Sequence, residues 1–377
     1  MKTIAIDGNE ANITDRVGVN FYAYEILHGL HKLQDSWKGR LKFIVYLKEK
    51  PLQDMPKELV GSWEYRVLPG KGLWILTRLM PRLWLNKDNV SLLFSPSHYT
   101  VPFSGVPRVC SIMDLGYLKF TGQFQKKVFW QLKYWSAISV LVSKHIIAIS
   151  RATKEDIVRQ YPFASKKTSV IHLGFDKTKF NTKVPANDVR RIKEKYHIVD
   201  DYVLYLGTLK PSKNIERVIE AFGLIGSKYP KLKLVIAGKK GWLFDEIFKT
   251  VNKCGIPDKV VFTDYFPDGD KPALLSGAKV LVSPSLFEGF GLHVLEAMAC
   301  GTPVVVSNVC SYPEIVGEAG LMVDPYKVSS VREGLEKILN MTEKQYNDLV
   351  AKGISQAGKF SWEDTSLKTL KLLEEQL

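Results

Sequence analysis

The sequence predicts an α/β protein with two doubly wound, Rossmann-like domains. Its 377 residues suit two domains of ordinary size. Hydrophobic residues make up 45% of the chain and charged residues 24%, which is typical of globular proteins. Short apolar runs alternate with helix-length stretches, and this alternation occurs twice. Such alternation favours parallel sheets that are covered by helices.

The first domain is expected to span residues 1–175. Its strands are predicted in the runs TIAID, LKFIVYL, SLLFSP, RVCSIMD, HIIAIS and TSVIHLG. A helix is expected from Asn20 to Leu33. Between the domains, residues 176–200 form a polar linker with one expected helix.

The second domain is expected to span residues 201–359. Its strands are predicted in the runs YVLYLGT, KLVIAG, KVVFTD, VLVSPS and TPVVVS. In doubly wound sheets the ligand binds beyond the carboxyl ends of the strands, where loops lead into helix N-termini. Chemistry is therefore sought in those loops.

The most informative segment is VSPSLFEGFGLHVLEAMACGTPVVV, residues 282–306. A strand is expected to end at Ser283, a glycine loop follows, and a helix is expected to begin near Leu292. Such a junction can bind an anion, because unpaired backbone N–H groups meet the positive end of the helix dipole. Gly289 and Gly291 would allow a phosphate to approach the backbone closely.

Two carboxylates accompany this loop. Glu288 lies in the loop itself, and Glu296 follows eight residues later in the helix. Carboxylates accept hydrogen bonds from sugar hydroxyls. The combination of an anion site with two acids suits a polyol phosphate.

This segment resembles the signature of the family 4 glycosyltransferases, which have the GT-B fold. Glu288 and Glu296 match the E-x7-E motif of that family, and LEAMACGTPVV matches as well. The resemblance implies that Glu288 contacts the donor sugar and that Glu296 binds the ribose hydroxyls. It also implies two domains that face each other across a cleft, and it adds Phe290, Gly291 and Leu292 to the expected substrate-binding residues.

A second motif, YLGTLKPSKNIERVIEAF, opens the second domain. Lys213 and Asn214 come just before a helix, where an ammonium group can meet a diphosphate. In the family that it resembles, the matching lysine stabilises the pyrophosphate leaving group. Thr208 is also expected near the donor, in a loop where many family members have an arginine; the second phosphate cation is thus unidentified.

Further matches, KLVIAGKKGW, DYFPDGD and GLMVDPY, extend the resemblance through most of the second domain. Asp268 and Asp270 mimic a metal-binding D-x-D pair. The family needs no such motif, so no metal ion and no cofactor is expected. The closing FSWEDTSLKTL resembles the GT-B helix that packs back on the first domain, and we assign residues 360–377 to it.

The first domain matches the family more loosely. DRVGVNFYAYEIL resembles its first glycine loop, in which the backbone near Gly18 approaches the donor phosphates. His98, in SPSHYTVP, is expected to line the active cleft. Met113, in SIMDLGYL, stands where many relatives have a histidine, so the neighbouring Asp114 or His98 would have to replace it. We therefore count Asp114 with Glu288 and Lys213 as candidate catalytic residues.

The positive charge of the chain is concentrated in its first half. Residues 1–175 hold 25 Lys and Arg against 13 Asp and Glu, an excess of 12 out of a net charge of +14. Two stretches mix basic and aromatic residues, Gly72–Lys87 and Gln125–Trp135. Both could rest on an anionic membrane surface. The alternative is an amphipathic core helix with a solvated basic face, and Pro81 would interrupt a helix through the first stretch. Nucleic acid is not an expected partner, because no recognition motif accompanies the charge.

The remaining features suggest a cytoplasmic protein at the inner face of the membrane. Four scattered cysteines without a C-x-x-C pair fit a reducing compartment. The N-terminal MKTIAIDGNEAN is expected to be a strand and not a signal peptide. The sequence has no run of about 18 consecutive apolar residues, the length that a membrane-spanning helix requires.

The sequence and its resemblance together predict a retaining, metal-independent glycosyltransferase in cell-surface polysaccharide synthesis. It would transfer a hexose of the mannose or glucose type from a nucleotide sugar to a glycan or a lipid-linked acceptor. GDP-mannose is the preferred donor, with UDP-sugars close behind. A nucleotide-sugar 2-epimerase of the same fold and a non-catalytic nucleotide-sugar-binding subunit remain alternatives. A dinucleotide-dependent oxidoreductase would need G-x-G-x-x-G after the first strand, where the chain has DGNEAN.

Overall fold

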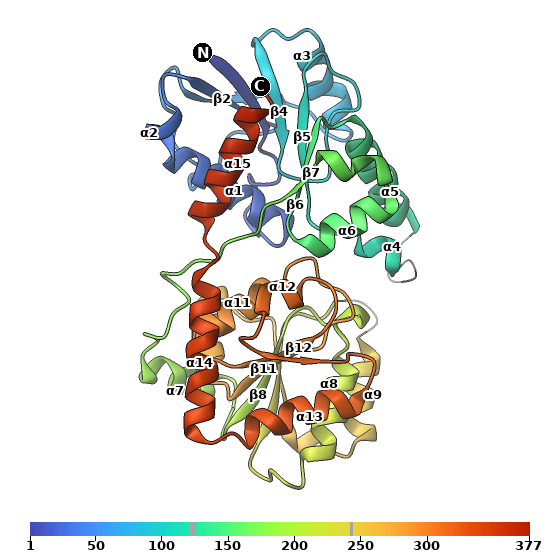
Figure 1. Cartoon of the computed structure of the whole chain (residues 1–377), viewed down its shortest axis with the longest axis vertical. Coiled ribbons are helices and arrows are strands. Elements are labelled where there is room, and N and C mark those ends of the chain that lie inside the picture. Colours follow the sequence, from blue (N-terminus) through green and yellow to red (C-terminus); the bar gives the residue numbers. More distant parts are fainter. Residues whose placement is uncertain (121, 123–125, 242–243) are drawn as a thin grey trace. The chain divides into compact units, whose positions relative to one another are not determined.

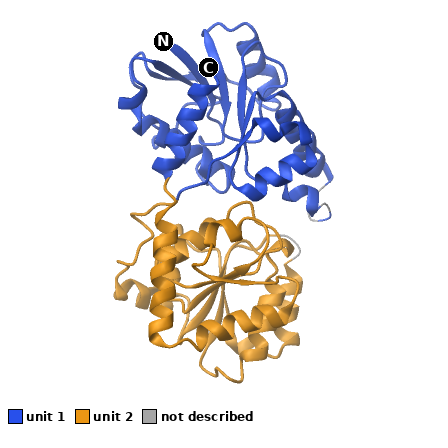
Figure 2. Cartoon of the chain, viewed as in Figure 1, with its two compact units in different colours: residues 1–174, 362–377 blue, residues 175–361 orange. Residues whose placement is uncertain are grey.

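The computed structural model describes residues 1–120, 122, 126–241 and 244–377. Gln125, which begins the second basic and aromatic stretch, and Trp242, which ends the KLVIAGKKGW motif, lie outside the described residues. The chain divides into two compact units (Figure 2). Unit 1 comprises Met1–Gly174 and Trp362–Leu377, and unit 2 comprises Phe175–Ser361. The segment that the sequence suggested as a linker belongs to unit 2 and contains one helix, α7 (Ala186–Lys195).

Unit 1 contains a seven-stranded parallel sheet in the order β3-β2-β1-β4-β5-β6-β7 (Figure 1). Six of its strands match the six predicted runs, and the sequence did not reveal β3. The central strands are buried over nearly their whole length, as expected for a parallel sheet that is covered on both faces. The strands are β1 (Lys2–Asp7), β2 (Leu41–Leu47), β3 (Trp63–Val67), β4 (Val90–Ser95), β5 (Arg108–Ile112), β6 (His145–Ala148) and β7 (Thr168–Val170).

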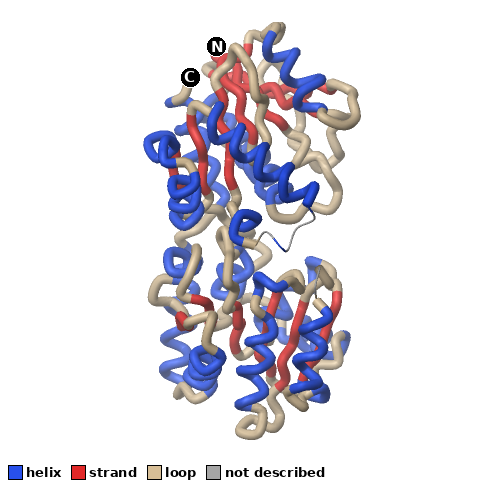
Figure 3. Tube along the Cα trace, turned by 90° about the vertical axis from the view of Figure 1, so that its right-hand side faces the viewer, coloured by secondary structure: helices blue, strands red, loops and turns tan. Residues whose placement is uncertain are grey.

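Helices connect these strands and flank them (Figure 3). The π-helix η1 leads directly into α3, and Pro81 lies in the first turn of α3, where its missing N–H does little harm. The helices of unit 1 are α1 (Val19–Lys32), α2 (Gln34–Trp37), η1 (Ile75–Leu79), α3 (Met80–Trp84), α4 (Gly116–Lys119), α5 (Lys126–Val142), α6 (Arg151–Gln160), η3 (Pro162–Lys167) and α15 (Trp362–Glu375).

Unit 2 contains a six-stranded parallel sheet in the order β10-β9-β8-β11-β12-β13. The prediction of a second doubly wound sheet is therefore confirmed. The strands are β8 (Tyr202–Leu206), β9 (Lys233–Ala237), β10 (Val260–Asp264), β11 (Val280–Ser283), β12 (Val304–Ser307) and β13 (Leu321–Val323).

The helices of unit 2 after α7 lie between these strands in the chain or follow the last of them. They are η4 (Pro211–Lys213), α8 (Ile215–Ile225), α9 (Asp245–Lys253), η5 (Pro257–Lys259), η6 (Asp268–Asp270), α10 (Lys271–Ser276), α11 (Leu292–Ala299), α12 (Tyr312–Val316), α13 (Val328–Leu339) and α14 (Glu343–Gly358). Within the described part of the chain, no helix is both long and apolar enough to cross a membrane.

Each sheet has a point at which the strand order reverses. In unit 1 it lies between β1 and β4, and in unit 2 between β8 and β11. At such a point the connections leave two neighbouring strands in opposite directions, so a crevice opens beyond their carboxyl ends. These two places are where each unit would bind a ligand.

Candidate functional site

In unit 2, the loops after β8 and β11 carry the two strongest motifs and are joined by their backbones. The N–H of Leu286 donates to the carbonyl of Ser212, with an N–O distance of 2.9 Å. Asn214 strengthens the connection. Its side-chain amide donates to the carbonyls of Pro284 at 2.9 Å and Pro325 at 2.7 Å. The reversal point is therefore lined by a single connected framework of loops.

Lys213 and Glu288 meet on this framework. The Nζ of Lys213 forms an ion pair with Oε2 of Glu288, and the two side chains are 13% and 18% exposed. Burial raises the pKa of Glu288, but the charges of Lys213 and His293 and the hydrogen bond from Lys213 together lower it, so the pKa lies below its ordinary value. Lys210, from the same loop as Lys213, also lowers this pKa. The site thus presents an ionised acid beside an ammonium group, and the sequence did not suggest a part for Lys210.

Helix α11 begins directly after the glycine loop. Its N-cap is Gly291, with φ +97°, and no side chain caps the helix. The first N–H groups of an α-helix have no partner within the helix, so this end can receive an anion. A Cβ at position 291 would lie 2.6 Å from Cε1 of Tyr312. Glycine is needed here for both its φ angle and its size.

Two residues at the start of helix α12, Ser311 and Tyr312, support the glycine loop. The hydroxyl of Ser311 donates to the carbonyls of Glu288 at 3.1 Å and Phe290 at 2.9 Å. The hydroxyl of Tyr312 lies 3.5 Å from Oε2 of Glu288 and donates to it. These two residues hold the loop and the carboxylate in place, and sequence reasoning missed both.

A buried polar cluster extends from Tyr312. Its hydroxyl is hydrogen-bonded to Oγ of Ser283 at 2.7 Å, and Ser283 is bonded to Nε2 of His293 at 3.0 Å. Burial lowers the pKa of His293 to about 3, so the ring is neutral at pH 7. At neutral pH His293 therefore contributes hydrogen bonds to the site and not charge.

Glu296 also has a lysine partner. It is 6% exposed, and its Oε2 forms an ion pair with Nζ of Lys271, at the start of α10. The ammonium group of Lys271 also lies 5.3 Å from the ring centroid of Phe180. Both acids of the E-x7-E motif are thus held by lysines from distant segments. The pairing with Lys271 could not be read from the sequence.

The other predicted residues of unit 2 differ in what their side chains can do. Asn214 is 2% exposed, and its Oδ1 accepts from Arg217 at 2.6 Å, so its amide is engaged in holding the loops. Phe290 is 3% exposed and packs against Phe360, with ring centroids 6.0 Å apart. Its side chain therefore serves the core. Leu292 begins α11, and Thr208 follows β8 in the loop that leads to Lys213.

The D-x-D pair is engaged in ion pairs. Asp268 is paired with Lys179. Asp270 is 2.5 Å from Nζ of Lys195 and accepts from the hydroxyl of Tyr196 at 2.6 Å. These partners fix the loop to the segment that contains α7.

In unit 1, Gly18 and His98 both lie beyond the carboxyl ends of the reversal-point strands. Gly18 precedes α1 with φ +54°, a conformation that favours glycine. His98 follows β4, and burial lowers its pKa to about 4. Its Nε2 is buried and has no hydrogen-bond partner among the described residues. A neutral imidazole with one unsatisfied nitrogen fits the predicted role of lining a site, which stays a prediction.

Two further positions follow the next strand, β5. Asp114 is exposed, and its Oδ1 accepts from the backbone N–H of Gly116 at 2.8 Å. Met113 is half-buried, and its carbonyl accepts from the hydroxyl of Thr153 at 3.1 Å. The carboxylate of Asp114 is accessible to a ligand, whereas the thioether of Met113 cannot replace the hydrogen bonds of a histidine.

The loop after β1 adds a feature that sequence reasoning missed. Asp7 is 7% exposed, and burial raises its pKa. The pKa of Glu10 is also raised, first by burial and then by the charge of Asp7. Asn20, on α1, donates to Oε2 of Glu10. Perturbed acids at a reversal point are candidates for binding hydroxyl groups.

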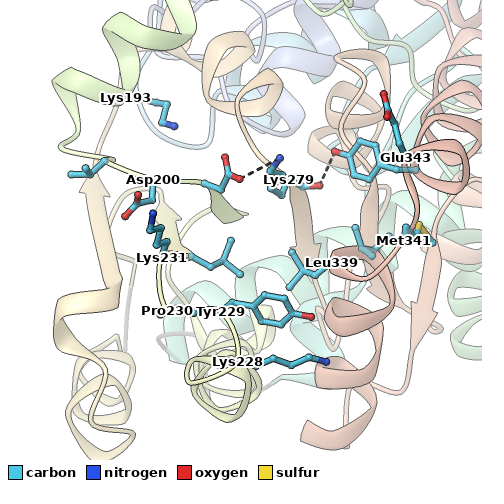
Figure 4. A pocket seen from close by; sticks show the side chains of 15 residues that line it. Lys193, Asp200, Lys228, Tyr229, Pro230, Lys231, Lys279, Leu339, Met341 and Glu343 are labelled. Carbon is cyan, nitrogen blue, oxygen red and sulfur yellow. Dashed lines mark hydrogen bonds and ion pairs between the residues drawn. The ribbon is translucent and has the colours of Figure 1, made fainter.

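A separate cavity of about 950 Å³ lies at the opposite end of the strands of the unit 2 sheet (Figure 4). Asp201, Leu232 and Lys279 line it, and these residues immediately precede β8, β9 and β11. Lys279 pairs there with Asp201 at 3.3 Å. The cavity is therefore at the amino ends of the strands, away from Lys213 and Glu288.

Comparison with known proteins identifies relatives of similar sequence. O-antigen chain mannosyltransferase B of Escherichia coli is 32% identical over 234 residues, which are 60% of this chain and 60% of that protein. The match thus spans less than two thirds of that relative's length. O-antigen chain mannosyltransferase RfbU of Salmonella typhimurium is 26% identical over 341 residues, 84% of this chain and 91% of that protein.

Similarity of structure extends over the whole chain. The Anabaena protein Alr3699/HepE, solved in complex with UDP-glucose, matches with a TM-score of 0.73 and 16% identity over 100% of both chains. At this identity the match shows the fold alone. Residues 18–179 match the family model described as Glycosyltransferase Family 4, and residues 188–356 match Glycosyl transferases group 1. With the two parallel-sheet units of the GT-B fold and these two matches in succession, the chain belongs to the family 4, group 1 glycosyltransferases.

Proposed function

We propose that the protein transfers a hexose of the mannose type from a nucleotide sugar to a glycan or lipid-linked acceptor in cell-surface polysaccharide synthesis. The observation that carries this proposal is the arrangement at the reversal point of unit 2. There the Lys213–Glu288 pair lies on the two loops that flank the crevice, and the glycine loop of Glu288 leads into the uncapped start of α11. An anion site beside an ionised carboxylate suits a diphosphate with an attached sugar.

In this proposal Lys213 changes partner when the donor binds. Its ammonium group leaves Glu288 and pairs with the diphosphate, which also meets the N–H groups at the start of α11. Glu288 then accepts hydrogen bonds from sugar hydroxyls, and Glu296 accepts them from the ribose. Lys213 and α11 would stabilise the negative charge that develops on the leaving diphosphate.

Transfer with retention requires no covalent enzyme intermediate. The bond between the sugar and the diphosphate breaks, and the acceptor oxygen bonds to the anomeric carbon on the same face. The proton of the acceptor hydroxyl passes to the departing diphosphate. The contribution of the protein is to orient the reactants and stabilise the developing charge.

The nature of the sugar is supported by the relatives. The two bacterial relatives above are both named as O-antigen chain mannosyltransferases. We therefore propose mannose, with GDP-mannose as the donor to test before UDP-sugars. HepE was solved with UDP-glucose, so UDP-glucose is the second donor to test.

We further propose that no metal ion takes part. Lys213 and the start of α11 supply the positive charge that a metal would otherwise provide, and both acids of the D-x-D pair are bound to lysines. Chelation with EDTA should therefore leave the transfer rate unchanged. A loss of activity that Mg²⁺ or Mn²⁺ restores would contradict this point.

The decisive experiment measures donor binding and transfer separately. Thermal shift with GDP-mannose and UDP-glucose identifies the donor, and transfer of radiolabelled sugar to a lipid-linked oligosaccharide measures activity. Glu288→Ala and Lys213→Ala should each lower turnover by about 10²-fold or more, as loss of one electrostatic group does in other enzymes.

The matched control is Lys195→Ala, which removes another paired lysine of unit 2, distant in sequence from the glycine loop. It should keep most of the activity. Unchanged turnover in the Glu288 and Lys213 variants would remove both residues from the mechanism. If the product is an epimerised nucleotide sugar that forms without an acceptor, the protein is an epimerase and not a transferase.

A further inference from the structure

Helix α5 of unit 1 is apolar on two opposite sides. Its inner side packs on the unit, where Ser136, Ser139 and Val140 are buried. Phe129 and Leu132 pack against the same core cluster. An amphipathic surface helix would have a polar outer side. The outer side of α5 does not follow this rule.

Four apolar side chains form a stripe along that outer side. They are Trp130, Tyr134, Ile138 and Leu141, and their spacings of four, four and three residues place them on one face of a helix. Trp130 is 45% exposed, Tyr134 60% and Leu141 64%, while Ile138 is half-buried. The rings of Trp130 and Tyr134 stack with centroids 5.4 Å apart. A continuous apolar stripe of this kind indicates a surface that binds a partner.

The charge of α5 identifies the kind of partner. Lys126, Lys127 and Lys133 lie in its first half, and the sequence of the helix, KKVFWQLKYWSAISVLV, contains no Asp or Glu. The ammonium group of Lys133 lies 4.8 Å from the ring centroid of Trp130. Tryptophan, tyrosine and lysine together are the side chains that suit the interface between lipid headgroups and acyl chains.

In the other basic and aromatic stretch, three of the apolar side chains belong to the core. Trp74, Leu79 and Leu83 are 3%, 0% and 0% exposed and belong to a buried cluster with strands of the sheet. The exposed large hydrophobic side chains of the stretch, Leu73, Trp84 and Leu85, lie near its two ends. The sequence offered no ground to prefer one of the two stretches as a membrane surface. The structure does, because α5, unlike the other stretch, exposes a row of apolar side chains along one face of a helix.

We propose that the outer face of α5, formed by Trp130, Tyr134, Ile138 and Leu141 with Lys126, Lys127 and Lys133, docks on the surface of an anionic lipid bilayer. The aromatic and aliphatic side chains enter the boundary between headgroups and acyl chains, and the lysines bind the lipid phosphates. This inference rests on the proposed function only in that a lipid-linked acceptor gives the docking a purpose.

The test uses the full chain and flotation with vesicles. The vesicles contain phosphatidylglycerol mixed with phosphatidylcholine, or phosphatidylcholine alone, at low and high salt. We expect the chain to float with the anionic vesicles at low salt and to be released by high salt. The double variant Trp130→Ser/Tyr134→Ser should bind at least about tenfold more weakly, and each Lys→Gln change at 126, 127 or 133 should cost roughly fivefold.

The matched control is Trp84→Ser/Leu85→Ser, which removes an exposed tryptophan and an exposed leucine from the other stretch. It should keep the binding of the native chain. Equal loss in both double variants, or no flotation of the native chain, would overturn the proposal. Self-association of the native chain that the α5 variant abolishes, seen by sedimentation without lipid, would assign the stripe to a second copy of this chain and also overturn it.

The proposal and the proposed function can fail separately. Thermal shift with GDP-mannose in the absence of vesicles measures the donor site alone. A chain that floats but binds no nucleotide sugar would contradict the proposed function and leave the docking surface intact. A chain that binds the donor but does not float would contradict the docking surface only.

Discussion

Each of the two acids of the E-x7-E motif forms an ion pair with a lysine. Lys213 pairs with Glu288 and Lys271 with Glu296, and all four side chains are at most 18% exposed. A buried pair is weak evidence of net stability, yet removal of one partner is costly because the other charge stays buried. The first pair must open for the proposed donor to bind, whereas the second can stay closed and position Glu296.

Replacement of Lys271 should therefore weaken binding more than turnover. We expect Lys271→Met to lower the free energy of unfolding by about 3–5 kcal/mol, because Glu296 loses its buried counter-ion. The dissociation constant of the donor should rise about tenfold or more, and kcat at saturating donor should change little. Denaturant unfolding and donor titration measure the two effects.

The control for this variant is Lys249→Met, whose partner is Glu246; the two side chains are 69% and 66% exposed. Exposed pairs contribute about 0–1 kcal/mol, so this change should be nearly silent. If both variants behaved alike, Lys271 would not be the residue that positions Glu296.

The Lys213–Glu288 pair should also be visible in the pH dependence of stability. The pKa of Glu288 is lowered in the folded chain, so its ionised form stabilises the fold at pH values above the ordinary pKa of glutamate. This contribution is lost as the pH falls through the lowered pKa. The difference in unfolding free energy between the native chain and Glu288→Gln should thus be constant near neutral pH and shift against the native chain on acidification.

Urea unfolding of both proteins from neutral to acidic pH measures this difference. His293 and Tyr312 also face Glu288. Burial raises the pKa of Tyr312 far above neutrality, so Tyr312 does not titrate on acidification. Burial lowers the pKa of His293 to about 3, and its positive charge lowers the pKa of Glu288, so the comparison is made at pH values above the His293 titration. A native-chain advantage that grew on acidification would contradict the pairing.

At the scale of elements, helix α11 has a glycine with positive φ at each end. Gly291 precedes it with φ +97°, and Gly301 follows it with φ +81°. A Cβ at position 291 would approach the Tyr312 ring to 2.6 Å, whereas at position 301 the nearest atom would be 3.5 Å away. The two positions therefore separate the cost of the φ angle from the cost of crowding.

We expect Gly301→Ala to cost about 1–2 kcal/mol of unfolding free energy from backbone strain alone. Gly291→Ala should cost more, and it should also abolish donor binding because the glycine loop must move away from Tyr312. Thermal unfolding and donor titration of the two variants check this. If the two variants were equally stable and both still bound the donor, the glycine loop would tolerate displacement from Tyr312.

The sequence predicted the elements of the site better than the contacts between them. Apolar runs revealed eleven of the thirteen strands in the described part of the chain, and β13 was not among them. The runs also missed β3, whose sequence WEYRV is half polar; both missed strands lie at the edges of their sheets. The glycine loop, the start of α11 and the two acids were predicted because their spacing is local. Lys271 and Tyr312 were not, because they lie 25 and 24 residues from the acids that they contact, and only the packing of the fold brings them together.

At the scale of the whole molecule, the chain returns to its first unit at its end. Helix α15 belongs to unit 1 and packs on α1, where a Cβ at Gly29 would lie within 1.8 Å of Oγ of Ser366. Trp362 contacts Phe21 with ring centroids 5.9 Å apart, and the hydroxyl of Thr365 donates to the carbonyl of His172 at 2.8 Å. Unit 1 is thus completed only when the last residues of the chain are present.

A substitution in the last helix should consequently weaken unit 1 and leave unit 2 intact. Leu373 is fully buried in α15, and Leu373→Ala should cost about 2–5 kcal/mol. Leu367, on the same helix, is 52% exposed, so Leu367→Ala is the control and should cost less than about 0.5 kcal/mol. Amide hydrogen exchange should show faster exchange in β1 and α1 of the Leu373 variant and unchanged protection in β8 and α11. Because Lys213, Glu288 and Glu296 lie in unit 2, this variant should still bind GDP-mannose at low temperature. Equal loss of protection in both units would mean that the two sheets unfold as one.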